Sequence, residues 1–164
     1  MFEIGDYVVN ATNGICQIKE VVKMDLSGGK QEKEYFYLEP VDEKSAKAYI
    51  PLDIAPTRIR KVIDAKKATE VISAVDSIEE LLVSSERERE AIYKAAIKSC
   101  EPTELVAMIK NIFRRKKERL EAGKKITAVD ERYCKLADGH LYSELAFALE
   151  KTKDEIRVLL WKTE

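Results

Sequence analysis

Along the first 62 residues, apolar and polar positions alternate with the two-residue period of β-strands. The stretch EIGDYVVNATNGICQIKEV (3–21) is interrupted once, at Asn13-Gly14, which supplies the positive φ of a tight hairpin turn. Further strands are predicted at KEYFYLEP (33–40), KAYIPL (47–52) and TRIRKVI (57–63), and the last should return beside the first strand. Four or five short strands in about 60 residues are typical of a small Tudor/SH3-like β-barrel.

From Asp64 onward the apolar residues recur with the period of helices. Asp64 is an N-cap for the first helix, and Pro102 sits where a first helical turn begins. Ser85 opens the pattern S-x-x-E, a capping box that predicts a helix over residues 85–98. Thr127 begins another helix, and Thr152 caps a last short one. These signals predict a compact all-α bundle of four to six helices.

Two of the predicted helices carry apolar stripes, and the second stripe could face inward. The first stripe consists of Leu105, Met108, Ile109, Ile112, Phe113 and Leu120. The second consists of Val129, Tyr133, Leu136, Leu141, Leu145 and Leu149. The predicted fold class is therefore α+β in two modules, a β-barrel at residues 1–62 and a helical bundle at residues 63–164.

The composition describes a globular protein with a strongly ionised surface, because 45% of the residues are hydrophobic and 36% are charged. No apolar run approaches the roughly 18 residues of a membrane span, and the N-terminus does not resemble a secretory signal. The three cysteines, Cys16, Cys100 and Cys134, are far apart and form no Cys-x-x-Cys pair. The cysteines therefore indicate neither a disulfide framework nor a zinc site, and a reducing cytoplasm is the expected location. Cys16, on a predicted strand, is interpreted as a small core residue.

The net charge of −1 hides an uneven distribution. Residues 1–62 hold 9 basic and 10 acidic residues, whereas residues 103–126 hold 8 basic and 3 acidic residues. Within the second stretch, Arg114, Arg115, Lys116 and Lys117 occupy four successive positions and so surround a whole helical turn. Such a run is more often a solvated face than a nucleic-acid site, and without interleaved aromatic residues any contact should be to phosphates. Both alternatives remain open at this point.

No catalytic constellation stands out. The single histidine, His140, has no cysteine or carboxylate partner that a motif identifies, so a structural or surface role is expected. The pair Gly28-Gly29 lacks the context of a phosphate-binding loop and is interpreted as a turn. We therefore expect no enzyme activity, no metal and no cofactor, and a small enzyme using His140 or Cys134 is a minor alternative.

The chain resembles the CarD/CdnL family of bacterial transcription regulators in several segments that occur in the family's order. The β part carries IGDYVVNATNGICQI, KEYFYLEP and AYIPLDIAPTRIRKVI. The helical part carries ELVAMIKNIFRRKKERLEAGKKITAVDERY and LYSELAFAL. The resemblance therefore covers most of the chain.

This resemblance implies a division of labour. In the family, a Tudor-like module shared with transcription-repair coupling factors docks on the β subunit of RNA polymerase. The helical module contacts promoter DNA at the upstream edge of the melted region and affects the lifetime of the open complex. By this resemblance, the polymerase-binding residues are expected around Lys23, Tyr35, Lys47 and Tyr49.

Two departures from the family pattern matter. The family's first turn commonly reads Tyr-Pro-x-His-Gly, whereas this chain has Asn10-Ala11-Thr12-Asn13-Gly14 and keeps only the glycine. Well-studied members also place a tryptophan wedge near the start of the helix predicted at 85–98, where residues 86–90 are all Glu or Arg. Because an apolar wedge is missing, DNA contact here should depend on charge.

The sequence thus predicts a non-enzymatic regulator that binds the polymerase β subunit and promoter duplex DNA, and no membrane or small-molecule substrate. The phosphate-contact candidates are Arg87, Arg89, Lys94, Arg114, Arg115, Lys117 and Lys125. The alternative is an adaptor that binds polymerase without touching DNA, which the acidic residues Glu86, Glu88 and Glu90 favour.

Overall fold

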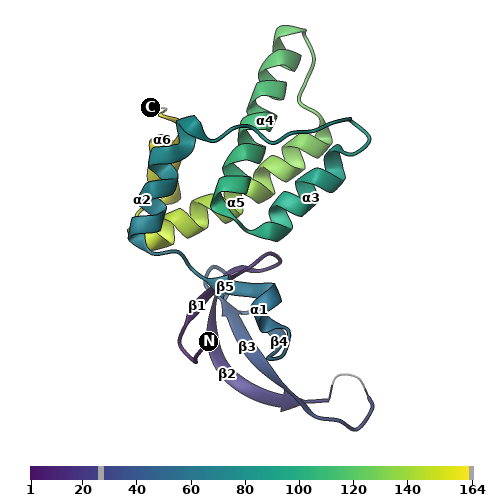
Figure 1. Ribbon diagram of the computed structural model, residues 1–164, viewed down its shortest axis with the longest axis vertical. Coiled ribbons are helices and arrows are strands. Elements are labelled where there is room, and N and C mark those ends of the chain that lie inside the picture. Colours follow the sequence, from purple (N-terminus) through teal and green to yellow (C-terminus); the bar gives the residue numbers. More distant parts are fainter. Residues whose placement is uncertain (26–27, 163–164) are drawn as a thin grey trace. The chain divides into compact units, whose positions relative to one another are not determined.

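A computed structural model describes residues 1–25 and 28–162 and divides the chain into two compact units, Met1–Val62 and Ile63–Glu164 (Figure 1). We call these the sheet unit and the helical unit and describe each by itself. Together they confirm the predicted α+β class, with a five-stranded antiparallel sheet first and a helical region after it.

The sheet unit contains five strands in the order β4-β3-β2-β1-β5, and all neighbours are antiparallel. The strands are β1 (Tyr7–Asn10), β2 (Gly14–Met24), β3 (Lys33–Pro40), β4 (Ala48–Pro51) and β5 (Ile59–Lys61). The prediction that the last strand returns beside the first is confirmed, because Val9 of β1 pairs with Arg60 of β5. The two edge strands, β4 and β5, are connected by the short helix α1 (Ala55–Arg58), which contacts both.

Local chemistry explains the first hairpin. Asn10 pairs with Gly14, whose φ of +71° is the left-handed conformation predicted for this turn. The Asn10 side-chain oxygen accepts a hydrogen bond from the Thr12 backbone N–H at 2.7 Å, which stabilises the turn. Further along β2, the register with β3 shifts between Ile18 and Glu20, and a bulge of this kind bends a strand.

The core of the sheet unit is apolar. Its fully buried members include Val8, Ile18 and Leu38, each 0% exposed. Cys16 is also 0% exposed, which confirms its predicted place in the core, and burial raises the pKa of its thiol to about 11. The thiol therefore stays protonated at neutral pH and behaves as a small hydrophobic side chain.

The helical unit contains five α-helices and one short 3-10 helix within the described residues, in agreement with the predicted bundle. The elements are α2 (Ala65–Ala74), η1 (Val75–Ser77), α3 (Arg89–Ser99), α4 (Pro102–Glu121), α5 (Ala128–Leu149) and α6 (Lys153–Trp161). Helix α5 packs against α2, α3, α4 and α6, so it is the central element of the core (Figure 1).

Most of the predicted helix starts are confirmed. The side chains of Asp64, Thr127 and Thr152 each accept a hydrogen bond from a backbone N–H in the first turn of the helix that follows. Pro102 occupies the first position of α4.

The prediction of a capping box at Ser85 is wrong. Helix α3 begins four residues later, at Arg89, and its N-cap residue Glu88 makes no side-chain capping bond. The Ser85 carbonyl instead accepts the Glu88 backbone N–H in a turn, and the Glu88 carboxylate is occupied by the Ser84 hydroxyl. A Glu that is bound elsewhere cannot complete the reciprocal bond that a capping box requires.

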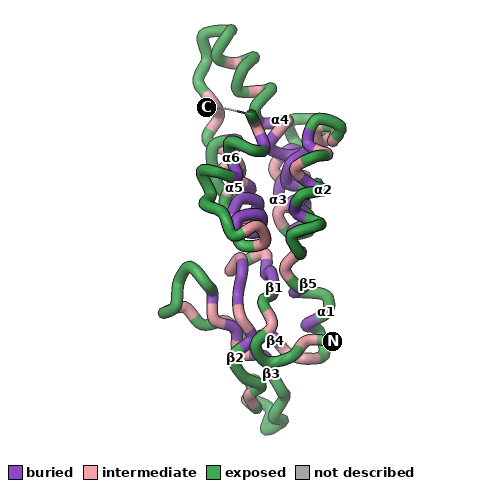
Figure 2. Tube along the Cα trace, turned by 90° about the vertical axis from the view of Figure 1, so that its left-hand side faces the viewer, coloured by how far each residue is buried: buried purple, intermediate pink, exposed green. Residues whose placement is uncertain are grey.

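The predicted apolar stripe of α4 is buried only in its first half (Figure 2). Met108, Ile109 and Ile112 are fully buried, whereas Phe113 is 39% exposed and Leu120 is 56% exposed. The stripe therefore faces the core only in part, because the second half of α4 extends beyond the helices that cover the first half (Figure 1). Leu136 of α5 is likewise exposed rather than inward.

Candidate interaction surfaces

The sheet unit presents an aromatic face on the side opposite its core. Successive side chains of a strand point to opposite faces, so Phe36 and Leu38 face the core while Tyr37 faces outward. Tyr37 lies directly across from Tyr49 of β4, with ring centroids 5.4 Å apart and the rings tilted by 30°. Tyr49 is 41% exposed, so this aromatic pair is open to a partner.

The four predicted polymerase contacts do not gather on one surface. Tyr49 lies on edge strand β4, and the exposed Lys47 directly precedes that strand. Tyr35 is on the same face as Tyr49 but is only 8% exposed. Lys23 pairs with Glu34 across β2 and β3, and the alternation of side chains places it on the other face. The structure therefore brings Lys47 and Tyr49 together and leaves Lys23 apart.

In the helical unit, the predicted DNA contacts fall into two groups, and the first group, Arg89, Arg114 and Arg115, is bound to carboxylates of the same unit. Arg89 is 8% exposed, and its guanidinium donates to the Tyr93 hydroxyl and to the Asn111 side-chain oxygen, both at 2.8 Å. It also forms an ion pair with Glu86 at 2.9 Å. Arg89 therefore connects α3 with α4 rather than facing solvent.

Arg115 belongs to the same polar cluster. Its guanidinium donates to the fully buried carboxylate of Asp130 at 2.9 Å and also pairs with Glu86. Asp130 accepts a second hydrogen bond from the Tyr93 hydroxyl at 2.8 Å. Burial, more than the nearby Asp130, raises the pKa of Tyr93 to about 12. The cluster therefore joins α3, α4 and α5 through charge-assisted hydrogen bonds.

Arg114 and Lys110 hold a strap that runs from residue 78 to residue 88 and crosses α4 between α2 and α3 (Figure 1). The Arg114 guanidinium donates to Glu80 at 2.7 Å, and the Lys110 ammonium donates to the Ile78 carbonyl at 2.6 Å. The Leu81 backbone N–H adds a bond to α4. Glu80 and then Glu118 raise the pKa of Arg114.

The second group of predicted DNA contacts is exposed. Arg87 precedes α3, Lys117 lies on α4, and Lys125 lies in the loop before α5. Lys94 has a side chain that is 67% exposed and only a long contact, 3.9 Å, with Glu90. These four cations can reach an external anion without breaking a buried ion pair.

The acidic residues near the start of α3 also have defined partners. Hydrogen bonds from Arg89 and then Arg115 lower the pKa of Glu86, so this carboxylate stays ionised. Glu90 accepts hydrogen bonds from Arg132 at 2.6 Å and from the Tyr133 hydroxyl at 3.1 Å. The acidic side chains therefore neutralise part of the basic surface around them.

Sequence reasoning missed the polar residues that organise the cluster, above all Tyr93, Asn111 and Asp130. Tyr93 and Asp130 are 37 residues apart, and nothing in the local pattern indicates that they meet. The sequence indicated only that Asp130 lies in the first turn of a helix that begins at Thr127. The Thr127 hydroxyl oxygen does accept a hydrogen bond from the Asp130 backbone N–H. The residues that hold the helical unit together thus carry no signature of their own.

The two residues of the minor enzyme alternative lie on α5. Burial, and then the charge of Asp138, raises the pKa of the Cys134 thiol to about 12. A thiol with such a pKa is a poor nucleophile at neutral pH, because the thiolate is the reactive form. His140 is partly buried on the same helix. The raised pKa therefore argues against Cys134 as the nucleophile of the enzyme alternative.

In residues 1–25 and 28–162, no group of three or more His, Cys, Asp or Glu side chains is placed to hold a metal ion. Over the same part of the chain, no helix is long and apolar enough to cross a membrane.

Comparison with known proteins identifies the sheet unit. Residues 2–63 match the family model described as the CarD-like/TRCF RID domain. A search of curated proteins found no match. An RNA polymerase-interacting domain of this kind implies a transcription regulator that binds RNA polymerase. CarD-like regulators are non-catalytic, although transcription-repair coupling factors share the module, so the match only suggests a non-enzyme. Residues 2–63 are thus a CarD-like/TRCF RID domain, the N-terminal module that CarD proteins and transcription-repair coupling factors have in common.

Proposed function

We propose that this protein binds the β subunit of RNA polymerase through the sheet unit, residues 1–62, and contacts promoter DNA through the helical unit, residues 63–164. In doing so it modulates the stability of the open complex at initiation. The observation that carries the proposal is the RID match, which covers the sheet unit almost completely.

The edge strand β4 is the proposed centre of the polymerase surface. An edge strand has backbone donors and acceptors on one side that no strand of its own sheet uses, so a partner can pair with it. Tyr49 adds an exposed aromatic ring on this strand, and aromatic side chains are frequent anchors of interfaces. Lys47 beside it adds a positive charge for an acidic partner surface.

DNA contact is proposed for the exposed cations of the helical unit, Arg87, Lys94, Lys117 and Lys125. The local excess of positive charge in residues 103–126 supports this proposal, because a basic face attracts a polyanion in a protein that is nearly neutral as a whole. Arg89, Arg114 and Arg115 act in this proposal as braces, since their guanidinium groups are bound to carboxylates of the same unit.

A second candidate function, a polymerase-binding adaptor without DNA contact, is favoured by one observation. Three of the seven predicted phosphate contacts, Arg89, Arg114 and Arg115, are held in ion pairs within the helical unit, two of them with Glu86. Glu90 also contacts Lys94, one of the other four. Each internal pair reduces the charge that remains for DNA. The salt dependence of duplex affinity separates the two functions.

The test of the proposed function uses the full chain and purified RNA polymerase. Tyr49→Ala should weaken binding to the polymerase, and to its isolated β subunit, by about tenfold or more if the ring is an interface anchor. The matched control is Tyr7→Ala, because Tyr7 is 40% exposed but lies on β1, away from the β4 edge. The control should change affinity by less than about twofold.

Open-complex lifetime on a promoter provides the functional readout. Wild-type protein should change this lifetime, and Tyr49→Ala should abolish the change at concentrations where wild type is effective. Equal loss of binding in both tyrosine variants, or undiminished binding in Tyr49→Ala, would contradict the proposed β4 surface.

A further inference from the structure

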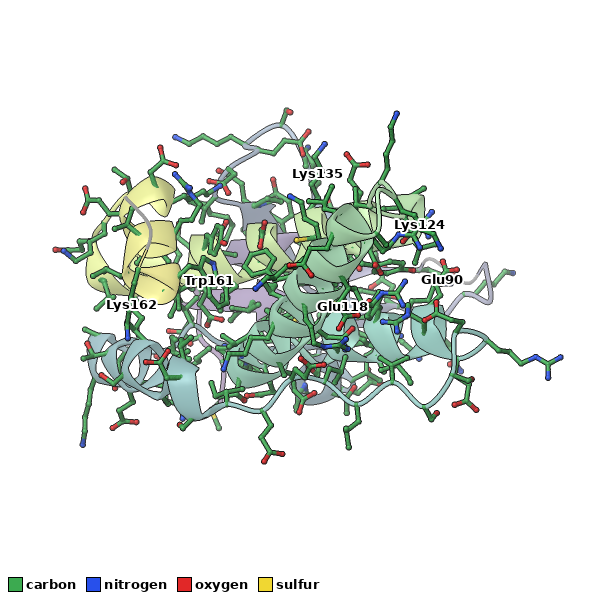
Figure 3. All side chains as sticks on the ribbon, turned by 90° about the horizontal axis from the view of Figure 1, so that it is seen from above. Glu90, Glu118, Lys124, Lys135, Trp161 and Lys162 are labelled. Atoms are coloured by element: carbon green, nitrogen blue, oxygen red, sulfur yellow. The ribbon has the colours of Figure 1, made fainter. Side chains whose placement is uncertain are left out.

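The exposed second half of α4 carries an unpartnered stripe. The apolar positions of this helix continue past Ile112. The next one, Phe113, is partly covered by Trp161 of α6, whose ring centroid lies 5.2 Å from that of Phe113. Trp161 lies on the side of α6 that faces α4 (Figure 3). Beyond this contact, Leu120 is 56% exposed.

This α4 stripe lines a shallow hollow of about 300 Å³. Its members lie at successive turns on one side of the helix and are Phe113, Lys116, Lys117, Leu120 and Glu121. Neither Lys116 nor Lys117 has a hydrogen-bond or ion-pair partner within residues 1–25 and 28–162. The stripe is therefore apolar at its start, basic in its middle, and apolar with one acid at its end.

The outer side of α6 carries a second stripe, which lines a hollow of about 400 Å³. Its members are Lys151, Asp154, Glu155, Val158 and Leu159. Val158 is 39% exposed and Leu159 is 43% exposed, although α6 buries Ile156 and Leu160 on its other side. This stripe is basic at its start, acidic in its middle and apolar at its end.

The two stripes have the same spacing and complementary chemistry. Each occupies positions i, i+3, i+4, i+7 and i+8 of the sequence, and Lys151 lies just before Thr152, the N-cap of α6. When the helices are laid antiparallel, Val158 and Leu159 meet Phe113. The acidic pair of α6 then meets Lys116 and Lys117, and Lys151 meets Leu120 and Glu121. On both helices these layers are separated by about 5–6 Å, because a helix rises about 1.5 Å per residue.

We propose that the α6 stripe of one molecule docks antiparallel on the α4 stripe of a second copy of this chain. The α6 stripe cannot reach the α4 stripe of its own molecule, because Ile156 and Leu160 fix the helix with the opposite side inward. A surface ion pair between Lys162 and Asp76 of η1 also connects the end of α6 to its own unit (Figure 3).

The contact is heterologous, since each molecule offers a different stripe to each neighbour, so copies add head to tail or close into a ring. A single pair of short helices buries less surface than a standard interface, and the association is therefore weak and concentration-dependent. The internal pairs of α6 compete little, because Lys151–Glu155 and Arg157–Asp154 are long contacts of 3.9 Å and 3.7 Å at the surface.

Sedimentation velocity of the full chain from micromolar to millimolar concentration tests this proposal. Wild type should associate reversibly, and Lys116→Glu/Lys117→Glu should weaken the association by about tenfold or more, because two acidic surfaces then face each other. Asp154→Lys/Glu155→Lys should have the same effect. A mixture of the two variants should regain association, since each supplies the intact stripe that the other lacks.

The control variant is Lys66→Glu/Lys67→Glu, which makes the same charge change at exposed positions of α2 and should associate as wild type does. Unchanged far-UV circular dichroism and thermal midpoints show that the variants are folded. The proposal is overturned if wild type is monomeric throughout, if the mixture fails to associate, or if the control weakens association equally. Loss of duplex DNA binding in Lys116→Glu/Lys117→Glu, with wild type monomeric, would overturn the docking proposal and leave the α4 stripe only the DNA contact proposed for Lys117.

Discussion

The interiors of the two units differ in how they use polar groups. Among the described residues of the sheet unit, the one buried polar side chain is Asn10, which supports a turn. The helical unit buries Arg89, Asn111, Asp130 and Glu144. Asp130 is 0% exposed and accepts bonds from two other elements. The helical unit is therefore held by ions as well as by apolar packing.

This difference explains why a run of basic residues is hard to interpret from sequence. Arg115 and Lys116 are neighbours, yet the Arg115 side chain is 14% exposed and paired with Asp130, whereas Lys116 is exposed. In a helix, adjacent residues point in directions about 100° apart, so one run supplies both internal braces and surface charge. Net charge over a segment thus overstates what remains for a partner.

The largest expected effect comes from breaking the buried cluster of the helical unit. Asp130→Ala removes the buried carboxylate that accepts hydrogen bonds from Arg115 and Tyr93, and it leaves the largely buried Arg115 with only the exposed Glu86 as a partner. We expect the free energy of unfolding to fall by about 3–5 kcal/mol. Urea unfolding followed by the fluorescence of Trp161, the single tryptophan, measures the helical unit directly.

Glu131→Ala is the control for this variant, because it removes the adjacent, exposed carboxylate of the same helical turn. It should change stability by less than about 0.5 kcal/mol. If Asp130→Ala costs no more than the control, the buried cluster is not a stabilising feature and the contrast between the two units fails.

The corresponding change in the sheet unit removes apolar packing. Leu38→Ala opens a cavity at a fully buried position of β3 and should cost about 2–5 kcal/mol. Hydrogen exchange of peptides from β1 to β3 should rise, while the Trp161 unfolding transition stays where it is, because the two units have separate cores.

The exposed Val21 of β2 supplies the control, and Val21→Ala should leave exchange nearly unchanged. A shift of the Trp161 transition in Leu38→Ala would show that the units unfold together and would remove the basis for treating them separately.

The fold could be predicted from the sequence wherever local signals act. The alternation of apolar and polar residues predicted the strands, Gly14 indicated the first turn, and Asp64 and Thr152 indicated helix starts. Each of these signals depends on residues only a few positions apart. The Ser85 capping box failed because Glu88 is bound by Ser84, which a motif cannot show.

The candidate sites were less predictable, since they depend on contacts between distant segments. Glu86 and Arg115 are 29 residues apart, and no spacing rule links them. The inward turn of Arg89 depends equally on Asn111, 22 residues away. The apolar pattern of α4 also could not show that the helix is longer than the helices that cover it, which leaves Leu120 exposed.

A smaller effect is expected from the exposed cations. If Lys117 and Lys125 contact phosphates, Lys117→Gln/Lys125→Gln should flatten the logarithmic dependence of duplex affinity on salt by roughly two units, one for each released counterion. Affinity at moderate salt should fall by about three- to tenfold for unrelated duplexes alike. Fluorescence anisotropy with labelled duplexes, with polymerase present if binding is weak, measures both quantities.

Lys66→Gln/Lys67→Gln removes the same charge from α2 and should leave the slope unchanged. Parallel slopes for wild type and for the Lys117 and Lys125 variant would exclude phosphate contact by these residues. The adaptor function would then be the better account of the helical unit.

The smallest expected effect concerns Asp138 of α5, because ionisation of this carboxyl lowers the free energy of unfolding of the helical unit. Burial raises the pKa of this carboxyl, and its Oδ1 atom has no hydrogen-bond partner within residues 1–25 and 28–162. The folded state therefore prefers the protonated form, and stability is lost as pH rises from the ordinary pKa of an aspartate through the raised pKa of Asp138. Asp138→Asn should be more stable than wild type near neutral pH by no more than about 1 kcal/mol, and the difference should vanish in acid. Urea unfolding by Trp161 fluorescence at several pH values measures it, with the exposed Glu70→Gln as the control. If Asp138→Asn is less stable than wild type at neutral pH, the charge of Asp138 stabilises the helical unit, as the charge of Asp130 is expected to do.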